Sequence, residues 1–133
     1  MNERENAIEH FRSRGVHLSP RKIGDKSVFG VQCRDRHIFD EDLRHLSALR
    51  DKLDVIGLEG TRITDEGLHH LTALPHLDNV DLTNTGITDT GLQVLATIKT
   101  LEFVHLEGTK VTATGVAMLR DAVPKCEVVW DGD

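Results

Sequence analysis

The chain has 133 residues, and its 22 acidic against 16 basic residues give a formal net charge of −6 at pH 7. This balance argues against nucleic-acid binding, which normally requires a basic surface. The sequence contains no stretch of roughly 20 apolar residues, and residues 1–10 are too charged for a signal peptide. We therefore expect one folded domain in the cytoplasm, without a membrane association.

The N-terminal segment, residues 1–27, is predicted to form a helical cap. Residues 3–14 have the apolar spacing of an amphipathic helix, and Gly15 is typical of the residue that ends one. Residues 16–18 alternate like a short strand, which we expect Pro20 to interrupt. The segment precedes a repeat array, whose first unit needs a cover. An N-terminal arm that contacts a partner is the alternative interpretation.

From residue 53 onward, the sequence repeats with a period of 24 residues. The units begin LDVIGLEGTRITDEGL at residue 53, LDNVDLTNTGITDTGL at residue 77 and LEFVHLEGTKVTATGV at residue 101. A degenerate unit precedes them, with Ile38 in the column of Ile63, and a half-unit that contains Val128 follows. We interpret residues 28–133 as one continuous domain of about four units and a closing strand.

Each unit has the pattern of a strand followed by a turn and a short helix. Ile56 and Leu58, two positions apart, place two apolar side chains on one strand face. At the turn, we expect the hydroxyl of Thr61 to hydrogen-bond the backbone of a neighbouring unit. Thr64 is a predicted helix N-cap with acidic residues after it. Gly67 costs about 1 kcal/mol relative to Ala in a helix, so its recurrence indicates that helix and strand approach too closely for a Cβ.

These units resemble leucine-rich repeats, because they match LxxLxL followed by Thr where that family carries Asn, Cys or Thr. TRITDEGLHHL and TGITDTGLQVL are similar to the ITDxGLxxL variant of small bacterial leucine-rich repeat proteins and to the cysteine-containing repeats of F-box substrate adaptors. In the third unit, Ala113 replaces the usual Asp. The resemblance implies an α/β fold, a short right-handed solenoid with a parallel sheet on its concave face. It also implies protein–protein recognition, without catalytic residues or a cofactor.

The two cysteines test this stacking. Cys33 belongs to the first strand and Cys126 leads into the fifth, so strands about 4.8 Å apart separate them by about 19 Å. A disulfide needs Cα atoms within about 7 Å. Both cysteines are therefore predicted to be free thiols, with Cys33 buried.

Strand alternation predicts the side chains that face outward from the sheet. The predicted rows across the strands are Gly30, Val55, Asn79, Phe103, Glu127; then Gln32, Gly57, Asp81, His105, Val129; then Arg34, Glu59, Thr83, Glu107, Asp131. The candidate partner-binding residues are Val55, Glu59, Asn79, Asp81, Phe103, His105, Glu107 and Val129. Phe103 is an exposed aromatic in an acidic and polar field, as binding anchors often are. Alternatively, it packs on neighbouring side chains.

We therefore expect a non-catalytic module that binds an unidentified protein. The outward face measures only about 300 Å², against roughly 800 Å² per partner in a standard interface, so loops, the end strand or a second copy must contribute. One alternative is a structural homodimer that pairs through the exposed C-terminal strand.

The second alternative is an enzyme or metal site around Asp81, His105 and Glu107. Asp81 and His105 are neighbours across two strands, so a hydrogen bond between them is feasible. Glu107 stands about 6.5 Å further along its strand, which opposes three convergent ligands. The face has no Ser or Cys nucleophile and no phosphate-binding loop. We therefore expect no catalytic residue and no metal.

The sequence contains eight histidines, which leave a pH-dependent function open. The histidines predicted on the helical side are His45, His69, His70 and His76. We interpret them as solvated or half-packed helix residues.

Overall fold

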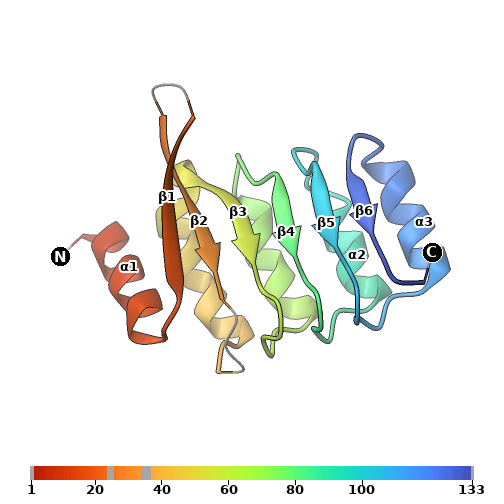
Figure 1. Cartoon of the computed structure of the whole chain (residues 1–133), viewed down its shortest axis with the longest axis horizontal. Coiled ribbons are helices and arrows are strands. Elements are labelled where there is room, and N and C mark those ends of the chain that lie inside the picture. The colour runs from red at the N-terminus through yellow and green to blue at the C-terminus, as the bar shows by residue number, and fades with distance from the viewer. Residues whose placement is uncertain (1, 24–25, 34–36, 133) are drawn as a thin grey trace.

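Six strands form one sheet in which they follow one another in chain order (Figure 1). The computed structural model describes residues 2–23, 26–33 and 37–132. The strands are β1 (His17–Ile23), β2 (Lys26–Gln32), β3 (Leu53–Gly57), β4 (Asn79–Asp81), β5 (Phe103–His105) and β6 (Glu127–Val129). The helices are α1 (Glu3–Ser13), η1 (Asp40–Lys52), η2 (Asp65–Ala73), α2 (Asp89–Leu95) and α3 (Ala113–Ala122), of which η1 and η2 are 3-10 helices.

Strands β2 to β6 are parallel, and β1 forms an antiparallel hairpin with β2. The central row of the parallel strands is Val31, Ile56, Val80, Val104 and Val128, all of them buried. The helices η1, η2, α2 and α3 cover one side of the sheet, and α1 lies at the β1 end (Figure 1). The apolar core lies between that side of the sheet and the helices. The prediction of a mixed α/β fold with parallel strands is confirmed.

The N-terminal region combines the predicted helix with an unpredicted hairpin. Asn2 caps α1 by accepting the Glu5 N–H at 2.8 Å, and Gly15 follows the helix with φ +74°. The prediction that Pro20 interrupts the strand is wrong, because β1 continues through it to Ile23. β1 is the outermost strand of the sheet, where a missing N–H costs no ladder hydrogen bond. Strand β2 begins at Lys26, so it spans the predicted boundary between the cap, residues 1–27, and the repeats, residues 28–133.

Aspartates link the starts of successive helices. The carboxylate of Asp65 accepts both the backbone N–H of Thr88 at 2.8 Å and its hydroxyl at 2.5 Å. The same pair of bonds joins Asp40 to Thr64 and Asp89 to Thr112. Such bonds to an ionised acceptor are stronger than neutral ones. All three threonines occupy the predicted N-cap positions. The hydroxyls of Thr88 and Thr112 accept a backbone N–H of their own helix, whereas the hydroxyl of Thr64 makes no such bond.

Recurrent glycines make room for these aspartates. A Cβ on Gly91 would clash with Oδ1 of Asp65, and it would lie 2.8 Å from Ile87 Cγ2 and 2.9 Å from Leu68 Cδ1. A Cβ on Gly67 or Gly115 would likewise meet the aspartate of the preceding helix: Asp40 or Asp89. The expectation that a Cβ is excluded is confirmed. The expectation that a strand excludes it is wrong, because the aspartate fills the space.

The turn threonines bond within their own segment. The hydroxyls of Thr61 and Thr85 donate to the carbonyls of Leu58 and Leu82 at 2.8 and 2.7 Å. The prediction of a bond to a neighbouring unit is therefore wrong. The turn brings the carbonyl three residues earlier within reach, which satisfies a hydroxyl that the core buries.

Both cysteines are free and Cys33 is buried, as predicted, and Cys126 is buried as well. Burial, with a smaller contribution from the charge of Asp42, raises the pKa of the Cys33 thiol to about 12. Burial and the charge of Glu127 raise the pKa of Cys126 to about 11. Both side chains are therefore protonated packing groups at neutral pH.

Among the described residues, no helix is both long enough and apolar enough to cross a membrane.

Candidate functional site

The sheet side opposite the helices carries the predicted outward rows; we call it the open face. The strand register contains the row Gly30, Val55, Asn79, Phe103, Glu127 and the row Gln32, Gly57, Asp81, His105, Val129. Backbone bonds continue this register past the strands, because Gly60 N–H donates to the Thr83 carbonyl at 3.0 Å and Asn84 N–H to the Glu107 carbonyl at 2.8 Å. Glu59, Thr83 and Glu107 are thus neighbours as predicted, whereas Arg34 lies outside the described residues.

Phe103 is the most exposed large apolar side chain that the structure describes. Its exposed fraction is 41%, and its register partners are Asn79 on β4 and Glu127 on β6. The other apolar residues of the outward rows, Val55 on β3 and Val129 on β6, are half-buried. Packing against neighbours therefore covers only part of the Phe103 ring, and a flat aromatic surface remains available on β5, next to the β6 edge of the open face.

The polar side chains of the open face bond along their own strands. Asp81 Oδ1 accepts the N–H and the hydroxyl of Thr83 at 2.9 and 2.6 Å. His105 Nδ1 lies 3.6 Å from Glu107 Oε1. The side chains of these two residues therefore meet although they lie two positions apart along the chain. Within the described part of the chain, no three His, Cys, Asp or Glu side chains are placed to hold a metal ion.

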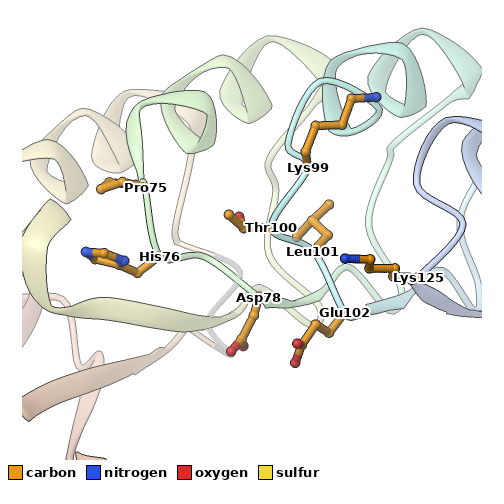
Figure 2. A pocket seen from close by; sticks show the side chains of 8 residues that line it. All are labelled: Pro75, His76, Asp78, Lys99, Thr100, Leu101, Glu102 and Lys125. Atoms are coloured by element: carbon orange, nitrogen blue, oxygen red, sulfur yellow. The ribbon is translucent and has the colours of Figure 1, made fainter.

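A hollow of about 390 Å³ borders the open face at the loops that enter β4 and β5. Its lining residues are Pro75, His76, Asp78, Lys99, Thr100, Leu101, Glu102 and Lys125. The carboxylates of Asp78 and Glu102 point to the same side, and Lys99 points away from them (Figure 2). Lys99 Nζ instead donates to the carbonyls of Ala96 and Ala122 at 2.8 and 2.9 Å. The hollow thus adds two carboxylates and the ammonium group of Lys125 to the edge of the open face next to Phe103.

A second exposed aromatic, Phe39, was not among the sequence candidates. It is 38% exposed, and the guanidinium carbon of Arg62 lies 5.9 Å from its ring centroid. The repeat alignment contained a usable signal, because it sets Ile38 beside Ile63 and therefore puts Phe39 in the column of Thr64. A cap position points away from the core, so an aromatic there is exposed.

A separate polar cluster joins α1 to η1. His10 Nε2 lies 2.9 Å from Oδ1 of the buried Asp42, and the ring of His10 stacks on His45 with centroids 3.8 Å apart. Asp42 also accepts the N–H of Phe39 at 2.9 Å, and Arg14 Nη2 lies 3.7 Å from it. Because a carboxylate only accepts hydrogen bonds, His10 carries its proton on Nε2.

His45 belongs to this cluster, and its buried Nε2 has no hydrogen-bond partner among the described residues. Burial, the charge of His10 and that of Arg44 lower the pKa of His45 from 6.5, against an opposing effect of Asp42. The interpretation of His45 as a solvated or half-packed helix residue missed this stacked partner, because His10 belongs to the distant helix α1.

We expect the docking of α1 to weaken as the pH falls below about 6.5. A lowered pKa means that the undocked chain binds the proton more readily, so the stabilisation from neutral His45 is complete above pH 6.5 and decreases below it. Amide hydrogen exchange of α1, corrected for intrinsic rates, measures this change. His45→Phe keeps a ring on His10 and removes the titration, whereas the exposed control His69→Gln retains it. Equal pH dependence in both variants would contradict the assignment.

The backbone at the outer edge of β6 is partly occupied by a side chain of the same molecule. The Val129 carbonyl accepts the Leu106 N–H at 2.8 Å and therefore points toward β5. Because backbone groups of successive strand residues point to opposite sides, the N–H and carbonyl of Val128 point away from β5. Arg120 Nη2 donates to the outward carbonyl of Val128 at 3.0 Å. A second chain that paired at this edge would have to displace Arg120, and this disfavours a homodimer formed through β6.

No model of a known protein family matches the sequence, and a search of curated proteins finds no match. The function is therefore argued from the open face itself.

Proposed function

We propose that the chain is a short leucine-rich repeat solenoid of the cytoplasm that binds a protein partner without catalysis. In this proposal, residues 1–27 cap the array, residues 28–133 form its units, and the open face is the concave surface. Three observations support it: the 24-residue period in the sequence, the parallel strands in chain order, and the aspartate links that recur between successive helices.

The observation that carries the binding proposal is the exposure of Phe103. An aromatic side chain that stays 41% exposed on β5, among mostly polar outward residues, costs solvation free energy unless a partner covers it. The shallow sheet excludes water poorly, which makes it a weak setting for catalysis but suits recognition. The small area of the face means that the partner also contacts the bordering loops.

Photo-crosslinking tests this proposal. With p-benzoylphenylalanine in place of Phe103, we expect one discrete protein adduct in the cells that produce the chain. The same group in place of Gln93, an exposed residue of α2 on the helical side, serves as the matched control and should give none. No adduct at position 103, or equal adducts at both positions, would contradict binding at the open face. An adduct with a second copy of the chain would favour self-association instead.

A further inference from the structure

The negative charge of the molecule is concentrated on and around the open face. The outward rows contain the acidic residues Glu59, Asp81, Glu107, Glu127 and Asp131. The adjoining hollow contains Asp78 and Glu102 together with Lys99 and Lys125. Among the described residues of the three outward rows, His105 alone can carry a positive charge, and Glu107 lies 3.6 Å from it. These acidic residues and the two lysines of the hollow have a formal net charge of −5, against −6 for the whole chain, so the remaining residues sum to about −1.

Phe103 lies within this acidic field. Glu127 is its register partner on β6, and Glu102 precedes it along the chain. The face of an aromatic ring attracts cations, and the nearby carboxylates accept charge-assisted hydrogen bonds from lysine or arginine. An aliphatic stem with a cationic head could therefore cover the ring and reach a carboxylate at the same time.

Resting on the proposed function, we infer that the partner presents a basic segment in which lysine or arginine flanks an apolar side chain. The apolar group covers Phe103, and the cations meet the carboxylates on either side of it. A second copy of the chain is a poor occupant, because two acidic faces would be brought together. Nucleic acid is repelled by the same charge.

Peptide selection tests the charge of the occupant. A phage-displayed library of random peptides is selected on the wild-type chain, and the enriched peptides are then measured for affinity. We expect enriched sequences to combine several Lys or Arg residues with an aromatic or aliphatic residue. Their affinity should fall about tenfold or more for Phe103→Ser and for Glu127→Lys, and it should decrease with rising salt.

Glu66→Lys is the matched control, because it makes the same charge change at an exposed residue of η2 on the helical side. We expect it to leave the affinity nearly unchanged. Failure to enrich any peptide, enrichment of neutral or acidic peptides, or equal losses for Glu127→Lys and Glu66→Lys would overturn the inference.

The crosslinking experiment separates the two proposals. If the adduct at position 103 maps to a neutral or acidic segment of the partner, the basic-segment inference fails while protein binding at the open face stands. If position 103 gives no protein adduct at all, the proposed function fails as well.

Discussion

Gly91→Ala is expected to lower the free energy of unfolding by about 2 kcal/mol, although Gly→Ala in an exposed helix raises it by about 1 kcal/mol. The added Cβ would clash with Oδ1 of Asp65, 2.8 Å from Ile87 Cγ2 and 2.9 Å from Leu68 Cδ1. The displaced carboxylate would also lose its two hydrogen bonds to Thr88. Urea unfolding of the two proteins measures the difference.

The matched control is Gly86→Ala. A Cβ there would have only the Ile63 carbonyl oxygen nearby, at 3.9 Å, so stability should stay unchanged or rise by up to about 1 kcal/mol. A rise in stability for Gly91→Ala would contradict the close packing of successive helices.

A double-mutant cycle at the next glycine separates the clash from other effects. The nearest atoms to a Cβ on Gly115 all belong to Asp89. The cost of Gly115→Ala should therefore largely disappear in an Asp89→Ala background, because the two changes act on one contact. Additive costs would show that the aspartate is not the group that excludes the Cβ.

Asp42→Ala is expected to lower the free energy of unfolding by about 3 kcal/mol. Its carboxylate is 2% exposed and accepts hydrogen bonds from the Phe39 N–H and from His10. Burial alone would raise the pKa of Asp42, but these two bonds and the charges of Arg14 and His10 outweigh burial and hold the pKa below 3.8. Removing one partner of a buried charged network leaves the others unpaired, which costs several kcal/mol.

The pH dependence of this contribution has a defined sign. Because the folded pKa of Asp42 is lowered, its stabilisation is present above about pH 3.8 and is lost as the pH falls below that value. Asp51→Ala is the control, since Asp51 is an exposed residue of the same helix, and it should change stability by less than about 0.5 kcal/mol. Equal effects of the two substitutions in chemical unfolding would contradict the buried network.

The repeat period predicted the register of the strands, and the resemblance to leucine-rich repeats implied that the strands are parallel. Each repeat unit has two apolar positions in its strand. If the pairing of neighbouring strands shifted by one residue, these side chains would face solvent, so only one register buries them. The row that contains Val55, Asn79 and Phe103 and the helix starts at Thr64, Thr88 and Thr112 followed from local pattern alone.

The partners of individual polar side chains required the tertiary structure. The Asp65 carboxylate was interpreted as a residue of its own helix, but it bonds Thr88 at the start of the next helix. The stacking of His10 on His45 and the passage of β1 through Pro20 were likewise absent from the local pattern.

The amino-acid sequence was thus enough to predict the features that every repeat unit shares, such as its strand and its helix start. Their burial depends only on which residues are apolar and how they are spaced. The sequence was not enough to predict contacts made by segments outside the repeat, such as the contact of α1 with η1. Those contacts depend on the angle and distance at which the elements pack, and these quantities exist only once the chain has folded.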